Sequence, residues 1–538
     1  MATTRLIGSA MGRWRSLLLG ALALAGLEII SPPLIAADNP AMAAATATPE
    51  IVKTAPGASA TEPKVQDPAA IREDWYVLMI DGVRAGHLMS RTRPSGTNII
   101  SETETTLKIK RGLTNVAIDM STLIEETSEG KPVRMKTVQK FGAQAMTQER
   151  TFTDKGVHIV RSQAGQVATE DAPLPDGQWL TPGAAARETK RRMDAGEKEF
   201  SLTVLDPASG DEPVTLRRKI LEQTVVSVLG RDVPALKCAI HVDKFGGIDV
   251  IEYISLAGVT VKGTIDLGVI KVDQVLADKA IALSPLNPPE LLVSTLVKPN
   301  RPIANPRTAT RAVYLLSVDG GKPFTIEAGA GQQVEVINER KVKVTIEPGR
   351  ADSFRADRAI REIHLQSSAM LAHEDPKVRE LLKAADDPKL STIERCERLR
   401  RYVHSFIDEK DLSVGFASAS EIARTKTGDC TEHGVLLAAL LRAAGIPARV
   451  ASGLIYVDEF VGAEHVFGYH LWTQALVESP DGTARWINLD ATLPDGSIFD
   501  ATHILLQTSA LNGGAMDNLM VNMVPLLGRL KIDVQEIK

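Results

Sequence analysis

A chain of 538 residues is too long to fold around one hydrophobic core, so we expect about two to four domains. Hydrophobic residues make up 44% and charged residues 24%, which is typical of a soluble globular protein. The net charge of −5 includes no basic excess, and we therefore expect no nucleic-acid partner.

Residues 1–37 have the pattern of a secretory signal peptide. Three arginines precede an apolar run at 17–27, and small residues follow at positions 36 and 37. The run is short for a transmembrane helix, although an uncleaved signal-anchor is the alternative and would be the only membrane attachment. We expect an exported protein, periplasmic or extracellular. Residues 38–70, rich in Ala, Pro and Thr, predict a disordered linker.

Residues 71–285 predict a mostly antiparallel β domain, sandwich or barrel-like. Apolar runs at 75–80 and 83–89 flank Asp81-Gly82, which is typical of a hairpin. A short helix is expected at 182–193, with Thr181 as its N-cap. Further strand candidates are 102–110, 214–216, 225–229, 248–256, 259–265 and 269–275. No group of chemically active residues stands out, so this domain has no predicted role.

Repeated prolines at 286–310 predict an extended connector, and residues 311–368 predict a small β segment. A helical period begins near residue 369. Ser391 and Glu394 form a capping box that opens a helix ending near Phe406. Cys396 lies early in this helix among charged residues, and we interpret it as a packing residue.

The stretch 427–449 reads TGDCTEHGVLLAALLRAAGIPAR and predicts a buried helix with a cysteine at its start. Gly445 and Pro447 are the expected signals of its end. A thiol in the first turn lies near the positive end of the helix dipole, where free backbone N–H groups stabilise thiolate, the reactive form. Cys430 is therefore the candidate nucleophile. With only two other cysteines, Cys238 and Cys396, the chain has no disulfide framework.

Strands are predicted at 448–457, 468–478 and 484–489, and Pro480-Asp481-Gly482 joins the last two as a hairpin. Facing side chains of such strands lie roughly 5 Å apart, so His470 on one strand and Asp490 at the end of the other can hydrogen-bond. His470 would be the base for Cys430, and Asp490 would orient it. Trp472 would shield the imidazole from water. In the tail, 513–538, residues 530–537 could add one edge strand.

The blocks GDCTEH, LLRAAGIPARVASG, HLW and NLDAT together resemble the transglutaminase-like (papain-like cysteine) superfamily in its bacterial form. The resemblance implies an α+β catalytic domain at 369–512. It also implies Cys430 as nucleophile, His470 as base and acid, and Asp490 as the orienting residue. This family often has a Trp or Gln upstream as second oxyanion donor. None lies between Leu371 and Cys430, and Phe416 cannot donate through its side chain.

Two metal sites are weaker alternatives. Cys430, His433, His465 and His470 could bind zinc. Glu432, Asp458, Glu459 and Glu464 could hold calcium or rim a cleft, but a solvated loop is the simpler interpretation. We expect no metal and no cofactor.

The expected function is acyl transfer through a thioester on peptide or protein substrates, with the cell envelope as their source. Hydrolysis, as in a peptidase or amidase, is favoured over cross-linking. The alternative is an envelope binding or scaffold protein whose transglutaminase-like domain is catalytically silent. The sequence gives no indication of the oligomeric state.

Overall fold

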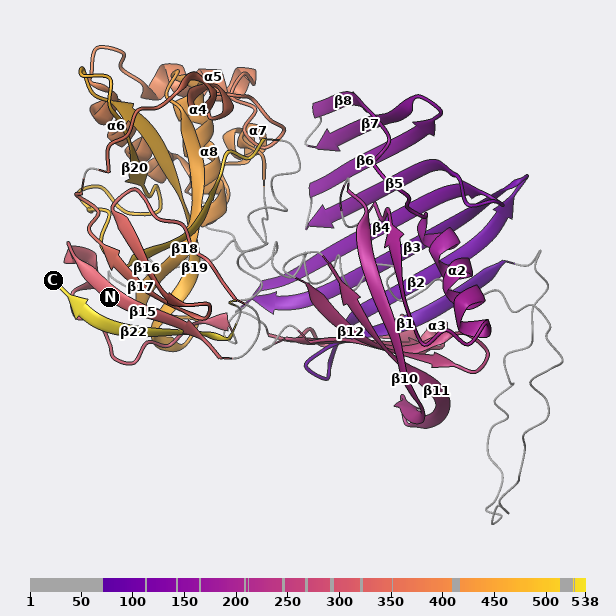
Figure 1. Ribbon diagram of the computed structural model, residues 1–538. Helices are drawn as coiled ribbons and strands as arrows, with labels where there is room; N and C mark the ends of the chain where they lie inside the picture. The colour runs from indigo at the N-terminus through magenta and orange to yellow at the C-terminus, as the bar shows by residue number, and fades with distance from the viewer. Residues whose placement is uncertain are drawn as a thin grey trace, which may run out of the picture.

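The computed structural model describes residues 71–111, 114–141, 144–163, 166–207, 210, 212–243, 247–266, 270–290, 295–319, 323–350, 352–408, 417–512, 526 and 528–538. The expected signal peptide, the expected linker and Phe416 lie outside the described residues. Figure 1 shows a large sheet in indigo and magenta on one side and the later elements, in pink, orange and yellow, on the other. This arrangement is the expected one: large antiparallel sheets precede a C-terminal α+β domain.

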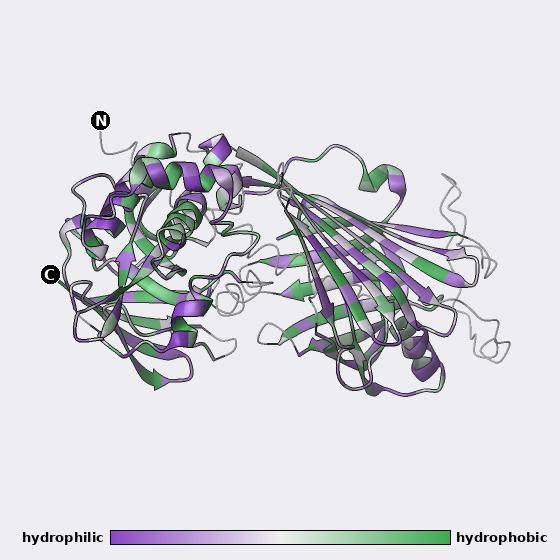
Figure 2. Cartoon of the chain, turned by 90° about the horizontal axis from the view of Figure 1, so that it is seen from above, coloured by the Kyte–Doolittle hydropathy of each residue, from purple (hydrophilic) through white to green (hydrophobic). Residues whose placement is uncertain are grey.

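The first part of the chain is one antiparallel sheet of fourteen strands. Strands that follow one another in sequence pair with each other, except β8 and β9, which form the two edges. The sheet is joined in the middle by pairing of β1 with β14, as in the pair Tyr76–Leu276. Hydrophilic and hydrophobic residues alternate along many of these strands, as Figure 2 shows. The strands are β1 (Arg72–Ile80), β2 (Val83–Ser95), β3 (Asn98–Arg111), β4 (Thr114–Thr127), β5 (Pro132–Phe141), β6 (Gln144–Thr153), β7 (Gly156–Gln163), β8 (Gln166–Ala172), β9 (Glu199–Val204), β10 (Val214–Val228), β11 (Arg231–Val242), β12 (Ile248–Ser255), β13 (Thr260–Asp266) and β14 (Lys271–Ala277).

Helix α2 (Pro182–Asp194) joins the two edge strands, β8 and β9. The predicted cap is confirmed, because the Thr181 hydroxyl accepts a hydrogen bond from the Ala184 N–H at 3.2 Å. The sequence predicted no strand at β4 to β9 or at β11. In β5 to β8 the apolar alternation is weak, and cross-strand ion pairs add to the backbone pairing, including Arg161–Glu170 at 2.7 Å.

Two four-stranded antiparallel sheets form the second part of the chain. The first has the order β16-β17-β15-β22, and the second has the order β20-β19-β18-β21. The predicted edge strand at 530–537 is confirmed, since β22 pairs with β15 on the outside of the first sheet. The strands are β15 (Ala312–Val318), β16 (Gln332–Asn338), β17 (Lys341–Ile346), β18 (Ala448–Phe460), β19 (Ala463–Glu478), β20 (Ala484–Leu489), β21 (His503–Ser509) and β22 (Leu530–Ile537).

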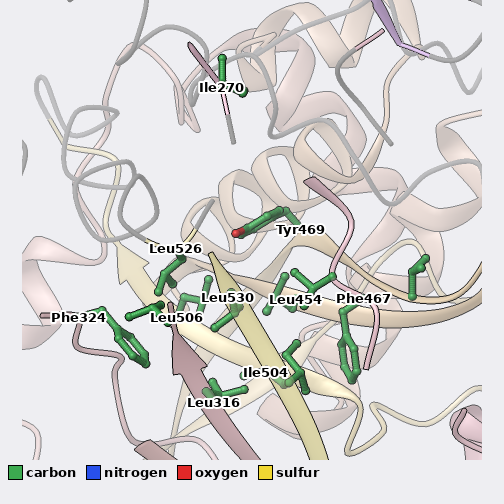
Figure 3. Close-up of a cluster of buried hydrophobic side chains, with 14 of the residues drawn as sticks. Ile270, Leu316, Phe324, Leu454, Phe467, Tyr469, Ile504, Leu506, Leu526 and Leu530 are labelled. Carbon is green, nitrogen blue, oxygen red and sulfur yellow. The ribbon is translucent and has the colours of Figure 1, made fainter. Parts of the chain in front are cut away.

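These two sheets share a hydrophobic core. Leu316 and Leu530 from the first sheet lie close to Leu454 and Ile504 from the second, as Figure 3 shows. The hydroxyl of Tyr314 also donates to the Ala501 carbonyl at 3.1 Å. The small β segment therefore supports the sheet that carries the candidate site.

The proline-rich connector is tied to both parts of the molecule. Val297 exchanges two backbone hydrogen bonds with Phe467 of β19, at 2.9 and 2.8 Å. At its other end, the Lys110 N–H of β3 donates to the Pro289 carbonyl at 2.8 Å. A short helix, α3 (Lys279–Ala282), precedes this connector.

The helices of the second part are α4 (Arg358–Ile363), α5 (Pro376–Ala385), α6 (Thr392–Phe406), α7 (Ala419–Thr425) and α8 (Cys430–Ala443). The Ser391–Glu394 capping box of α6 is confirmed. Every residue of α8 is buried, and Gly445, with φ of +77°, follows its end, also as predicted. No helix in the described residues is both long and apolar enough to cross a membrane.

Candidate active site

Cys430 is the first residue of α8 and is fully buried. The helix start is fixed by a capping box in which Asp429 Oδ1 accepts from the Thr431 N–H at 2.9 Å. Glu432 completes the box by accepting from the Asp429 N–H at 2.9 Å. A capped helix N-terminus holds the thiol of Cys430 in the position where the helix dipole favours a negative charge.

The start of α8 lies against the strand that carries His470. Thr473 Oγ1 donates to the Gly434 carbonyl at 2.9 Å, and a methyl group at Gly434 would collide with the Leu471 side chain. Near the other end of the helix, the Leu476 N–H donates to the Pro447 carbonyl. Helix and strand therefore run in the same direction. Cys430, one turn before Gly434, lies beside the part of β19 that precedes Leu471.

His470 and Asp490 form the predicted pair. The distance between His470 Nε2 and Asp490 Oδ2 is 2.7 Å, and neither side chain is exposed to solvent. Asp490 follows β20 directly, and the pairing of Thr473 with Leu489 sets the register that brings it to the histidine. Trp472 stacks beside the imidazole with a centroid distance of 6.1 Å, and it is buried, as expected for a water shield.

The other imidazole nitrogen of His470 is available for chemistry. His470 Nδ1 is buried and has no hydrogen-bond partner among the described residues. Because Nε2 faces a carboxylate, the Nε2–H tautomer is favoured, which leaves a lone pair on Nδ1. That atom can accept a proton from a thiol.

Asp490 is both a turn residue and an orienting residue. Its Oδ1 atom accepts from the Thr492 N–H at 2.8 Å and from Thr492 Oγ1 at 2.7 Å, while Oδ2 faces the histidine. Burial alone would raise the pKa of Asp490, but attraction to His470 and hydrogen bonds from His470 and His503 hold it well below its usual range. The carboxylate therefore stays ionised.

A second histidine, which the sequence did not single out, reaches the same carboxylate. His503 Nε2 lies 3.3 Å from Asp490 Oδ2, and His503 is fully buried at the start of β21. Its Nδ1 atom contacts the carbonyl of Asp500 at 3.1 Å and Oδ1 of the same residue at 3.3 Å. Asp490 therefore lies between two imidazoles.

The sequence carried one signal for this arrangement. Asp490-Ala491-Thr492 is repeated as Asp500-Ala501-Thr502, ten residues later. The second copy forms the same turn, with Asp500 Oδ1 accepting from the Thr502 N–H at 2.8 Å. The histidine that follows it, His503, continues into β21.

Helix α6 holds the loop that follows Asp490. Buried Arg400 donates from Nη1 to the Leu493 carbonyl at 2.7 Å. His404 Nδ1 lies 3.1 Å from the carbonyl of Ala491. These contacts fix the backbone on both sides of Thr492 and so limit movement of the orienting carboxylate.

The other two cysteines are poor candidates for a nucleophile. None of the three cysteines forms a disulfide. Burial raises the pKa of Cys396 to about 12 and that of Cys238 to about 11. Both therefore remain protonated at neutral pH, in agreement with the interpretation of Cys396 as a packing residue.

The structure does not assemble the zinc set considered from the sequence. His465 is half exposed and lies 3.1 Å from the Tyr456 hydroxyl, whereas Cys430 and His470 are fully buried.

Among the described residues, the one group of three with metal-ligand spacing is His470, Asp490 and His503, whose ligand atoms lie within 4.8 Å of one another. The contact of 2.7 Å between His470 and Asp490 has hydrogen-bond geometry. Ligands of one zinc ion lie farther apart, at roughly 3.3 Å, given bonds of about 2.0 Å. These residues therefore fit a hydrogen-bonded cluster better than a metal site.

The solvated-loop interpretation is wrong for Glu432. This residue belongs to the first turn of α8 and is fully buried, with one carboxylate oxygen accepting from the Ala417 N–H at 3.1 Å. Burial, and then repulsion from Asp429, raise the pKa of Glu432 well above its usual value. Asp458, Glu459 and Glu464 are exposed, as expected.

A family model and several solved structures resemble parts of this chain. The family model of the transglutaminase-like superfamily matches residues 378–491, while a search of curated proteins found no match. Among solved structures, a β-barrel-like protein of a domain of unknown function from Brucella abortus is 17% identical, with a TM-score of 0.31, and covers 38% of this chain and 95% of that one. A candidate cysteine protease from Cytophaga hutchinsonii is 13% identical, with a TM-score of 0.26, over 43% of this chain and 89% of that one.

A candidate protease from Parabacteroides distasonis is 11% identical, with a TM-score of 0.17, over 66% of this chain and 63% of that one. The family match contains Cys430, His470 and Asp490 and lies in the last third of the sequence. The chain therefore carries a transglutaminase-like superfamily domain, as its sequence motifs predicted.

Proposed function

We propose that this protein is an exported, cysteine-dependent acyl-transfer enzyme with the triad Cys430, His470 and Asp490. The observation that carries the proposal is the buried hydrogen bond of 2.7 Å between His470 and Asp490, which leaves Nδ1 of His470 open beside the helix start that bears Cys430. A nucleophile, a base and an orienting carboxylate are the parts that thiol catalysis needs.

The proposed first step is acylation. His470 Nδ1 takes the proton of Cys430, and the thiolate attacks the carbonyl carbon of an amide. A carbon–sulfur bond forms, the negative charge moves to the oxygen, and the helix N-terminus favours that charge. When the tetrahedral intermediate collapses, the carbon–nitrogen bond breaks. The amine leaves with the proton that His470 had taken.

The second step releases the acyl group. His470 takes a proton from water or from an acceptor amine, and the resulting nucleophile attacks the thioester. The carbon–sulfur bond breaks, and the thiolate recovers its proton from His470. Water would make the protein a peptidase or amidase, and an amine would make it a transglutaminase. We favour water and place the substrates among peptides or proteins of the cell envelope, because the first 37 residues have the pattern of an export signal.

The competing proposal is a binding or scaffold protein in which the catalytic domain is silent. The fourteen-stranded sheet has no assigned chemistry and could serve such a role. The two proposals differ in the reactivity that they require of Cys430.

Thiol labelling separates the two proposals. The purified full chain is treated with iodoacetamide near pH 7, and the adducts are mapped by mass spectrometry. Cys238 and Cys396 are matched controls, because both are as fully buried as Cys430. We expect Cys430 to react at least about tenfold faster than either, because only it has access to a base and a helix N-terminus.

Function is tested in parallel with general amidase and amine-incorporation assays. A Cys430→Ala variant should lose both activities, while Cys396→Ala, which removes a buried thiol from another helix, should keep them. Trapping an acyl-enzyme on Cys430 with envelope peptides would identify the substrate class. Equal labelling of the three cysteines, together with wild-type behaviour of Cys430→Ala, would leave the scaffold proposal standing.

A further inference from the structure

A row of oppositely charged groups runs from the partly exposed Arg307 to the buried triad that we propose. Arg307 Nη1 pairs with Asp500 Oδ2 at 2.6 Å, and Asp500 contacts His503 at 3.3 Å. His503 in turn contacts Asp490 at 3.3 Å, and Asp490 holds His470 at 2.7 Å. The side chains of Asp500, His503, Asp490 and His470 have no solvent exposure.

With His470 neutral, the charges of this cluster balance when His503 is protonated. Arg307 carries one positive charge, and Asp500 and Asp490 carry one negative charge each, so the cluster would have a net charge of −1 if His470 and His503 were both neutral. Burial would lower the pKa of His503, but attraction to Asp500 and hydrogen bonds with Asp490 and Asp500 raise it to about 9. At neutral pH the imidazolium compensates the second carboxylate.

His503 is not an alternative base. Both of its ring nitrogens are engaged, Nδ1 with Asp500 and Nε2 with Asp490. Its ring also stacks on Phe499 with a centroid distance of 4.0 Å. His470, by contrast, keeps Nδ1 open. The two imidazoles on Asp490 therefore have different roles.

Other charged groups lie near this cluster on each element that packs against it. Helix α8 brings Asp429, Glu432 and His433 around Cys430. From α6, Arg400 and His404 bind carbonyls after Asp490, and Arg400 also pairs with Glu397. Only Asp490 and Asp500 make ion pairs with His503 in the described part of the chain.

We propose that His503 is a positioning residue that remains protonated, shares Asp490 with His470, and thereby sets the pH range in which the Cys430–His470 pair works. The inference rests on the proposed function. With His503 charged, part of the negative charge of Asp490 is already compensated, so the carboxylate fixes the orientation of His470 without holding it permanently as imidazolium. His470 can then both take and return a proton.

The expected signature is a shift in pH dependence. In the His503→Gln variant, a side-chain amide can still donate to Asp490, but one buried positive charge is lost. Removing a positive charge disfavours the thiolate and favours the imidazolium, so both limbs of the pH profile move to higher pH. With the His470 and His503 rings 5.8 Å apart, we expect a shift of about one pH unit.

The experiment measures the alkylation rate of Cys430 by iodoacetamide from pH 5 to 10 in the full chain, which needs no substrate. The midpoint of the acid limb should rise by about one unit in His503→Gln. The double variant His503→Gln with Asp500→Asn restores charge balance and should return the midpoint to within about 0.3 unit of wild type. A purely structural role for His503 would change the rate or the melting temperature without moving the midpoint.

Each outcome decides the inference. An unshifted midpoint in His503→Gln, or a double variant that remains shifted, overturns it. If His503→Gln does not fold, the protonation of His503 is measured directly in the wild type by NMR titration of its imidazole, and a His503 that is neutral at pH 7 overturns the inference. If wild-type Cys430 reacts no faster than Cys238 and Cys396 at any pH, the proposed function fails first, and the two failures are thereby distinguished.

Discussion

The large sheet and the transglutaminase-like domain each bury charged side chains near a cysteine, but they do so with different chemistry. In the sheet, Arg218 and Glu252 form a buried ion pair close to Cys238. In the domain, two imidazoles share Asp490 close to the helix start of Cys430. The comparison shows that a buried ion pair near a cysteine does not by itself make the thiol reactive.

In the sheet, hydrogen bonds hold the two charged side chains in place. Glu252 accepts from Arg218 and from Thr260 Oγ1, the latter at 2.7 Å, and a guanidinium does not lose its proton near neutral pH. Burial raises the pKa of Cys238, and the nearby Arg218 only partly opposes this rise. This cluster therefore ties β10, β11 and β12 together and keeps its thiol protonated.

In the transglutaminase-like domain, Asp490 contacts two imidazoles, and an imidazole, unlike a guanidinium, can take and return a proton. One nitrogen, Nδ1 of His470, is left without a partner among the described residues. A buried polar atom without a partner costs free energy. Its position on β19, which packs against helix α8, agrees with the role of base that we propose for His470.

The largest expected effect comes from Asp490→Asn. Asparagine would still bind Thr492 through its oxygen, but its NH₂ group would face the two imidazoles and favour the wrong tautomer of His470. The acyl-transfer rate should fall by about 10³- to 10⁴-fold. It can be measured as amide hydrolysis or amine incorporation, with thermal unfolding as a check on folding.

The matched control in the other region is Glu252→Gln, which also replaces a buried carboxylate by its amide. Its acyl-transfer rate should stay within about twofold of wild type at a temperature where the protein is folded. A comparable loss of rate in both variants would contradict the division between a structural cluster and a reactive one.

Glu252→Gln should instead reduce stability. It leaves Arg218 buried without a counter-ion, which typically costs about 3–5 kcal/mol. Hydrogen exchange in β10, β11 and β12 should become faster, and the urea midpoint of the sheet should fall. Replacing both partners, as Arg218→Met with Glu252→Leu, should recover most of the stability, since the unpaired charge is then absent. A double variant as unstable as the single one would show that the cluster does more than balance charge.

The sequence predicted local features well. The helix start at Cys430, its end at Gly445 and the capping box of α6 follow from residues within a few positions of each other. The hairpin that brings Asp490 to His470 follows from the turn at 480–482. These features need no knowledge of distant contacts.

Features that depend on distant pairing were not predicted. The contact of His503 with Asp490 requires β21 to lie beside β18, on the far side of β18 from β19, and no local pattern specifies that order. The single fourteen-stranded sheet requires β1 to pair with β14, about 200 residues away along the chain. The burial of Glu432 depends on how α7 and α8 pack, because one of its partners is the N–H of Ala417.

The smallest expected effect is a dependence of the free energy of unfolding on pH that is confined to the transglutaminase-like domain. The pKa of His503 is raised to about 9 in the folded state, against about 6.5 in an unfolded chain. Its stabilising contribution is therefore complete below about pH 6.5 and is lost as pH rises through about 9. A shift of this size corresponds to at most about 3 kcal/mol.

His364, in the same domain, provides an internal control of opposite sign. Burial lowers its pKa to about 4, so its contribution is complete above about pH 6.5 and is lost as pH falls through about 4. Urea unfolding of the wild type between pH 6.5 and 9 should show the domain losing stability, and His503→Gln should flatten that slope, while His364→Gln should leave it unchanged. Because His503 lies in the transglutaminase-like domain and not in the sheet, hydrogen exchange in β10 to β12 should not follow the same pH dependence. A parallel loss of stability in both regions would mean that the imidazolium of His503 is not its cause.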